Sequence, residues 1–130
     1  SPVLSRQWRD RAGQFEALHS WIGENLSRAL SVEELAEYTH MSPRNFARVY
    51  TKSMGVTPAK AVEAIRTETA QALLETTDLS IKSIAHRCGF GDEDRMRRAF
   101  LRQLRVSPSE YRQNFQASEL DSEVRPEWTA

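Results

Sequence analysis

Apolar residues recur at helical spacing along most of this 130-residue chain, and polar stop signals divide them into short segments. Between Ser80 and Phe115 the pattern predicts three short helices separated by two turns. Gly89-Phe90-Gly91 marks the first turn, because glycine adopts left-handed backbone angles without steric cost. Ser107-Pro108 opens the third helix, with serine as N-cap and proline in the first turn. The apolar face of the middle helix consists of Met96, Ala99, Phe100 and Leu104.

The preceding part of the chain predicts four further helices by the same criteria. Their expected spans are 13–30, 31–39, 43–54 and 58–76. Ser31 begins a capping box with Glu34, and Ser42 caps the helix that ends near Gly55, a candidate left-handed C-cap. The first helix is expected to share one face among Phe15, Leu18, Ile22, Leu26 and Ala29. The inner face of 58–76 is expected to consist of Val62, Ile65, Thr69, Ala72 and Leu73.

Two stretches of the chain repeat each other at a nearly fixed distance. The pattern Ser31, Val32, Leu35, Ala36 recurs 49 positions later, and the pattern from Phe46 to Pro58 recurs 50 positions later. The one-residue slip falls in a turn, where an insertion costs least. The fold class predicted is therefore all-α, with seven helices in two helix-turn-helix units, at about 31–55 and 80–105, joined by a central helix at about 58–76.

A short helix, a turn and a second helix with an exposed basic face is typical of a helix-turn-helix DNA reader. Each unit has such a helix, and both keep an arginine outside the apolar face, at Arg48 and Arg98. The connecting helix would be about 28 Å long, which is close to one turn of DNA, about 34 Å. Two readers could then enter adjacent major grooves. A helical protein–protein interaction module without DNA binding remains the alternative.

Charge is unevenly distributed although the formal net charge is zero. Residues 31–115 contain 13 basic and 11 acidic side chains, whereas 116–130 contain one basic and four acidic. Nucleic-acid binding requires local basic patches rather than a basic total. Residues 1–12, including Trp8, are expected to form a linker, and 116–130 a disordered acidic tail. The ordered domain is then expected at 13–115.

No constellation of residues suggests an enzyme, a metal site or a cofactor site. The single cysteine, Cys88, excludes an internal disulfide and is expected to be a small buried residue. His19 has no partner at metal-binding spacing and is expected at the surface. A lone cysteine fits a reducing cytoplasm, and no apolar run reaches the roughly 20 residues of a membrane span.

Three segments are similar to the C-terminal DNA-binding domain of AraC-type transcriptional regulators. They are SVEELAEYTHMSPRNFARVY, GVTPAKAVEAIRTETAQALLETTDLSIKSIAHRCGF and RRAFLRQLRVSPSEYR. CGFGDEDRMRRAF with VSPSEYR most resembles the subgroup with an N-terminal glutamine-amidotransferase-like domain of the PfpI type. The resemblance implies a cytoplasmic, nucleoid-associated regulator that binds double-stranded promoter DNA and RNA polymerase. It also implies that an effector or dimerisation domain precedes residue 1.

The resemblance also assigns site residues by position. Base contacts are expected from Arg44, Ala47, Arg48, Asp94, Arg95 and Arg98. Phosphate contacts are expected from Ser42, Asn45, Lys52, Arg97 and Arg102. Arginine can donate two hydrogen bonds to guanine, and Asp94 could accept one from cytosine.

The chain departs from the family pattern at two places. Arg105 stands where the family usually has glycine, so a left-handed C-cap there would cost about 1 kcal/mol. The second reader helix starts with three acids, Asp92-Glu93-Asp94. They suit the helix dipole but would repel phosphates, so this unit is expected to bind more weakly or to select its site by exclusion.

Overall fold

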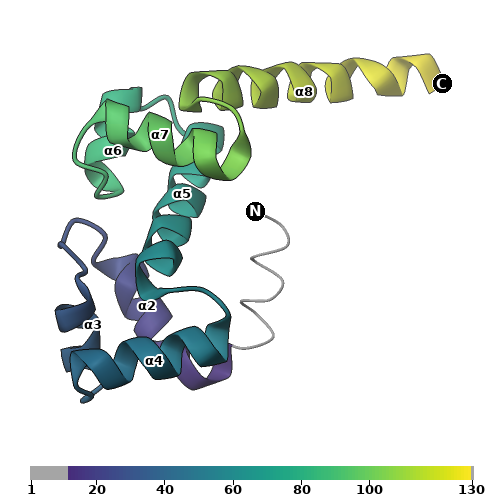
Figure 1. Ribbon diagram of the computed structural model, residues 1–130. Helices are drawn as coiled ribbons and strands as arrows, with labels where there is room; N and C mark the ends of the chain where they lie inside the picture. The colour runs from purple at the N-terminus through teal and green to yellow at the C-terminus, as the bar shows by residue number, and fades with distance from the viewer. Residues whose placement is uncertain (1–11, 130) are drawn as a thin grey trace.

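The computed structural model describes the backbone of residues 12–129 and the side-chain exposure of residues 13–120. Over this range it contains seven α-helices and one 3₁₀ helix, and the helices follow the predicted order (Figure 1). The elements are η1 (Ala12–Phe15), α2 (Glu16–Glu24), α3 (Val32–Tyr38), α4 (Pro43–Met54), α5 (Pro58–Thr76), α6 (Ile81–Arg87), α7 (Glu93–Leu104) and α8 (Pro108–Thr129). Residues 1–11, which include most of the predicted linker and Trp8, lie outside the described range.

The two helix-turn-helix units have matching helices. α3 and α6 each contain seven residues, and α4 and α7 each contain twelve. Each of these helices begins at a side-chain N-cap, in chain order Ser31, Ser42, Ser80 and Asp92. A capping oxygen accepts a hydrogen bond from one of the four backbone amides that a helix start leaves without a partner. The repeat in the sequence is therefore a repeat in the backbone.

Helix α5 contributes to two separate apolar cores. Its first half packs Ala61 and Val62 with Phe46 and Tyr50 of the first unit. Its second half packs Ala70 and Leu74 with the second unit. The predicted inner face of α5 was correct at Val62 and wrong at Ala72, which is exposed, while Ile65, Thr69 and Leu73 are only half-buried. The buried positions of α5 are mostly small or branched side chains, and they include Ala61, Val62, Ala64, Thr67, Ala70 and Leu74. Small side chains let helices on two sides approach the α5 backbone closely.

The predicted helix over 13–30 ends earlier than expected, at Glu24. The Asn25 side chain donates to the carbonyl of Trp21 (2.8 Å), in place of a further backbone amide. Residues 25–31 then form a loop that still buries Leu26 and Leu30, whereas Ala29 is exposed, contrary to the prediction. The apolar spacing that suggested a longer helix therefore arises partly from loop residues.

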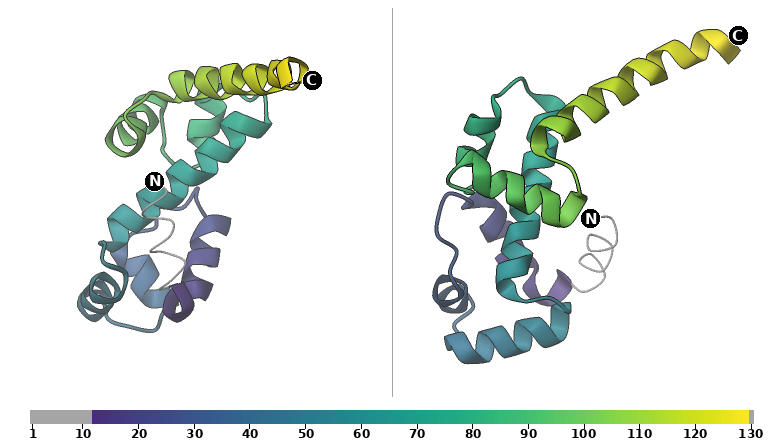
Figure 2. Two further views of the ribbon diagram at one scale, coloured as in Figure 1. Left: turned by 90° about the vertical axis from the view of Figure 1, so that its right-hand side faces the viewer. Right: turned by 45° about the horizontal axis from the view of Figure 1, so that its top comes forward.

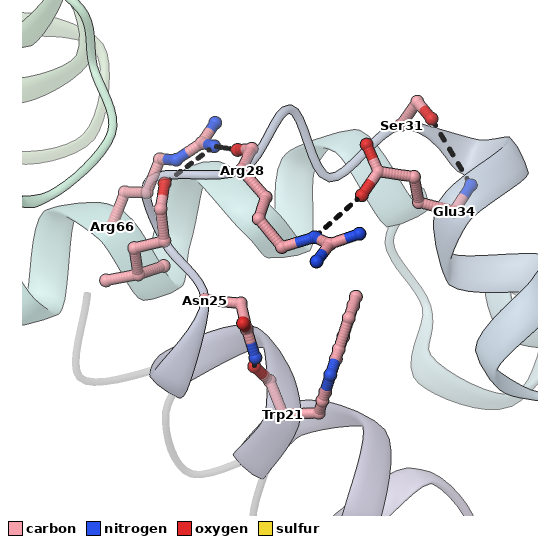
Figure 3. A network of polar contacts seen from close by, with 7 residues as sticks. Trp21, Asn25, Arg28, Ser31, Glu34 and Arg66 are labelled. Carbon is pink, nitrogen blue, oxygen red and sulfur yellow. Dashed lines mark hydrogen bonds and ion pairs between the residues drawn. The ribbon is translucent and has the colours of Figure 1, made fainter.

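The loop between α2 and α3 is held by hydrogen bonds to helices α3 and α5 (Figure 3). The Arg66 guanidinium of α5 donates through Nη2 to the carbonyls of Leu26 (3.1 Å) and Arg28 (2.8 Å). The Arg28 side chain donates to the Glu34 carboxylate of α3 (3.1 Å) and lies over the Trp21 ring. Buried carbonyls need such partners, since an unpaired buried polar group is costly. Arg66 therefore fixes the loop against α5.

His19 is buried, with 9% of its surface exposed, so the prediction of a surface histidine was wrong. Its Nε2 lies 2.8 Å from the Tyr50 hydroxyl, and the two rings meet edge to face. Burial lowers the pKa of His19 to about 4 and raises that of Tyr50. Helix α2 packs against the first unit along more of its surface than the apolar spacing alone indicated.

Helix α8 begins with the capping box expected at Ser107 and Glu110. The Glu110 amide donates to Ser107 Oγ (3.1 Å), and the Ser107 amide donates to the Glu110 carboxylate (3.0 Å). The structure differs from the predicted disordered tail, because α8 continues through Thr129 and projects away from the body (Figure 1). Residues 116–120 are exposed, and they include Gln, Ala, Glu and Leu, which favour helix without tertiary support.

The two helix-turn-helix units differ in the residue that follows their second helix, which is α4 in the first unit and α7 in the second. Helix α4 ends at Gly55 and α7 ends at Arg105, and both adopt left-handed backbone angles, with φ of 79° and 66°. We expect Arg105→Gly to raise the free energy of unfolding by about 1 kcal/mol, because glycine carries no steric penalty there. The shift of the urea midpoint measures this. Gly55→Ala is the reciprocal control and should lose a similar amount; a loss of stability in Arg105→Gly would contradict the argument.

Candidate nucleic-acid interface

Helix α4 presents a basic face without an acidic residue of its own. Arg44, Arg48 and Lys52 are exposed, while Asn45 and Ala47 are half-buried. Ser42 accepts a hydrogen bond from the Asn45 amide (3.3 Å), and the Arg48 guanidinium donates to the Asn45 side-chain oxygen (2.8 Å). The cap and this bond hold the first turn in shape and direct Arg48 along the helix. The predicted contact residues of the first unit therefore lie together on the exposed part of one helix.

Three of the four arginines of helix α7 form ion pairs with acids at its N-terminal end. The Asp94 carboxylate accepts from Arg97 (2.8 Å) and from Arg98, and Arg95 lies 3.7 Å from Asp92. Hydrogen bonds from Arg97 and Arg98 lower the pKa of Asp94 below its ordinary value. All five side chains are exposed, so these pairs contribute little to stability and can exchange partners. The acids at the start of α7 thus pre-order its arginines.

Helices α4 and α7 are presented on the same side of α5. Figure 1 shows both running across the direction of α5, and in the left panel of Figure 2 both are seen nearly end-on at the same side of it. Arg48 of α4 and Arg98 of α7 are both exposed, so neither is withdrawn into a core. Two similar basic helices on one side of a rigid connector could approach a single duplex together.

A cavity of about 490 Å³ lies where α5, α7 and the α2–α3 loop meet, and we call it the inter-unit cavity. Its lining includes five arginines, a single carboxylate and several small residues. The charged members are Arg28, Glu63, Arg66, Arg95, Arg98 and Arg102. The cavity therefore brings three predicted DNA contacts beside two arginines from elsewhere in the chain.

The single carboxylate of the inter-unit cavity has its own partners. Glu63 accepts hydrogen bonds from Arg102 (2.9 Å) and from the Gln103 amide (3.0 Å). Burial alone would raise the pKa of Glu63, but these hydrogen bonds lower it below its ordinary value. Burial lowers the pKa of Arg66, and among the described residues no carboxylate pairs with that guanidinium. Sequence reasoning missed Arg28 and Arg66 here, because neither lies on a reader helix.

The remaining candidate chemistry is sparse. Within the described residues no group of three or more His, Cys, Asp or Glu side chains could hold a metal ion. Cys88 is buried, as predicted, and burial raises the pKa of its thiol to about 11, so it is a weak nucleophile at neutral pH. Of the helices described, none has the length and apolarity needed to cross a bilayer.

Comparison with known proteins identifies the source of this arrangement. A family described as a helix-turn-helix domain matches residues 35–114. The chain is 46% identical over 84 residues to the HTH-type transcriptional regulator Rv1931c of Mycobacterium tuberculosis, covering 65% of this chain and 32% of that protein. It is 32% identical over 113 residues to the HTH-type regulator YijO of Escherichia coli, covering 87% and 40%. The chain thus spans about a third of the length of these relatives.

Among solved structures, the DNA-binding domain of the global transcriptional factor AdpA, in complex with a target DNA, superposes with a TM-score of 0.75. The two are 37% identical, and the match covers 79% of this chain and 93% of that one. The matched family accounts for the two repeated units, the connecting helix and the paired basic helices. The chain belongs to the AraC-type helix-turn-helix family, whose members are DNA-binding domains of transcriptional regulators rather than enzymes.

Proposed function

We propose that this domain binds double-stranded promoter DNA sequence-specifically, with α4 and α7 in adjacent major grooves, and thereby regulates transcription. The observation that carries the proposal is the placement of α4 and α7 on one side of α5 (Figure 2). The AdpA domain, to which this chain is similar over most of its length, was solved with a target DNA. Helix α5 contains 19 residues and is about 28 Å long, which suits grooves about 34 Å apart.

The arginines of the two helices are proposed as the readers of guanine. A guanidinium can donate two hydrogen bonds to the major-groove edge of guanine, which distinguishes that base from the other three. We assign this role to Arg44 and Arg48 of the first unit, and to Arg95 and Arg98 of the second. Ala47 offers only apolar contact, for instance with a thymine methyl group, and Asp94 could accept from cytosine.

The phosphate contacts are proposed at the margins of the same helices. The residues are Ser42, Asn45, Lys52, Arg97 and Arg102. Contacts of this kind set affinity and its salt dependence, whereas base contacts set sequence preference. The two classes therefore give different results when their members are removed one at a time.

Arg98→Ala should weaken binding to the preferred sequence by about 1–3 kcal/mol and relax the preference at one position. Lys52→Ala is the matched control. It removes one positive charge from the other reader helix, and it should weaken binding to every sequence alike and reduce the salt slope by about one. Affinities for the preferred duplex and for single-base variants at several salt concentrations measure both. A changed base preference in Lys52→Ala, or an unchanged one in Arg98→Ala, would contradict the assignments.

Selection of bound sequences from a random duplex pool tests the proposed arrangement directly. Two short motifs should emerge, with centres about one helical turn, 10–10.5 base pairs, apart. A single motif would refute the two-groove arrangement. Failure to enrich any sequence at low salt would refute the function itself and favour a protein-binding module.

The narrower assignment is that a glutamine-amidotransferase-like domain of the PfpI type precedes this domain in the full-length protein, as effector or dimerisation domain. The support for this assignment is the resemblance of the sequence at residues 88–100 and 106–112 to that subgroup. The coding sequence upstream of residue 1 decides the matter, since a different kind of domain there would refute it. A regulator of this kind would act in the cytoplasm, on the nucleoid, and through contact with RNA polymerase.

A further inference from the structure

The inter-unit cavity contains more positive charge than the surrounding structure uses. Five guanidinium groups and one carboxylate line it, and that carboxylate, Glu63, is already bonded by Arg102 and Gln103. Arg66 is fixed by two loop carbonyls through one nitrogen, Nη2, and its Nη1 points away from both of them (Figure 3). Half-buried and without a carboxylate among the described residues, this guanidinium is suited to bind an anion.

The other lining arginines have acidic partners that they can exchange. Arg95 and Arg98 pair with Asp92 and Asp94, which do not line the cavity, and Arg28 pairs with Glu34 outside it. Ion pairs between exposed side chains are weak, because water and salt screen them. A phosphate accepts several charge-assisted hydrogen bonds at once, so it can compete for these groups.

We propose that the inter-unit cavity is a phosphate-binding site, with Arg66 and Arg102 as its principal ligands and with Arg95 as a third when it is not engaged with a base. Its size, within the range of small-ligand pockets, accommodates a phosphate with its attached sugar. Ala29, Ala59 and Ala99 leave this room, since each contributes only a methyl group to the lining. The phosphate comes either from the DNA backbone between the two grooves or from a small phosphate-bearing molecule. The case in which the DNA backbone supplies the phosphate rests on the proposed function.

Glu63 has two effects on the proposed site. Its hydrogen bonds hold Arg102 against α5, and the same carboxylate repels an incoming anion. Removing Glu63 should therefore improve anion binding, whereas removing Arg102 should weaken it. A site in which these residues served only to join α5 to α7 would show neither response.

The test is calorimetric titration of the DNA-free domain with inorganic pyrophosphate, at constant ionic strength set with chloride. Saturable binding is expected in the wild-type domain. Arg102→Gln and Arg95→Gln should weaken it at least about tenfold, because each loses a charge-assisted hydrogen bond. Glu63→Gln should tighten it about threefold or more.

Arg87→Gln is the matched control. Arg87 is an exposed arginine of α6 that does not line the cavity and has no proposed contact with DNA. It should leave pyrophosphate binding unchanged. Equal losses in Arg95→Gln and Arg87→Gln would show unspecific attraction to a basic surface and overturn the proposal, as would the absence of saturable binding in the wild-type domain.

Competition identifies the source of the phosphate. If the DNA backbone occupies the cavity, pyrophosphate and duplex should exclude each other beyond the effect of ionic strength, and Arg102→Gln should abolish that competition. If the ligand is a small molecule, pyrophosphate and duplex should bind together; both results support the site. Failure of the proposed function would be seen separately, as a wild-type domain that binds pyrophosphate but no duplex.

Discussion

Gly89→Ala should lower the free energy of unfolding by about 2–5 kcal/mol. A methyl group on Gly89 would lie 1.8 Å from the carbonyl oxygen of Leu26 and 2.9 Å from Nε of Arg66. Overpacking against backbone typically costs about 1–3 kcal/mol, and the left-handed angle of Gly89, φ 81°, adds about 1–2 for an L-residue. The clash falls where the turn of the second unit meets the loop of the first, so it should also alter how the units are held together.

Gly91→Ala separates the two causes. Gly91 also has a left-handed angle, φ 93°, but an added methyl group would meet only the Arg95 side chain, at 3.5 Å. It should therefore lose only the backbone contribution, about 1–2 kcal/mol. Urea unfolding of both variants measures the difference. Equal losses would show that the contact between Gly89 and Leu26 is not tight, and would refute its role in joining the units.

Acid should destabilise the domain by about 3 kcal/mol through His19 alone. The pKa of His19 is about 4 in the fold and 6.5 in the unfolded chain, because burial disfavours the imidazolium. Below pH 6.5 the unfolded chain binds a proton that the folded one does not, so stability is complete above pH 6.5 and is lost as the pH falls toward 4. The slope approaches about 1.4 kcal/mol per pH unit in that window.

The difference between His19→Gln and the wild-type domain isolates this contribution, since glutamine can still bond the Tyr50 hydroxyl but does not titrate. Urea midpoints from pH 7 to pH 4.5 should fall less steeply in His19→Gln. His86→Gln, which replaces an exposed histidine, is the control and should retain the wild-type slope. Identical slopes in all three proteins would contradict the burial argument.

Local signals in the sequence were sufficient for most helix boundaries. Side-chain caps depend only on a residue and its next three neighbours, which is why Ser31, Ser42 and Ser107 were identifiable without tertiary information. The prediction of a buried Cys88 and of a left-handed turn at Gly89 was confirmed on similar grounds. The internal repeat predicted the pairing of units, because equal patterns form equal helices.

Tertiary packing explains what the sequence could not show. Helix α5 packs against two units, so its buried residues do not form a single apolar stripe. Its buried alanines give a weaker hydrophobic signal in the sequence than Ile65, which is only half-buried. His19 is buried because Tyr50, 31 residues away, supplies a polar partner. Arg66 belongs to the candidate site only because the α2–α3 loop folds against α5. Contacts between residues far apart in the chain leave no periodic signal.

The acids at the start of α7 affect how long the domain dwells on DNA. The first reader helix has no acidic residue, whereas in the second Asp94 holds Arg97 and Arg98. On DNA without the preferred base, we expect Asp94 to compete with a single phosphate for Arg97 and Arg98, so that dissociation is quicker. A guanine can accept two hydrogen bonds from Arg98, the proposed reader, so it should hold the domain longer than a single phosphate does. The domain should therefore spend little time at sites that lack this base.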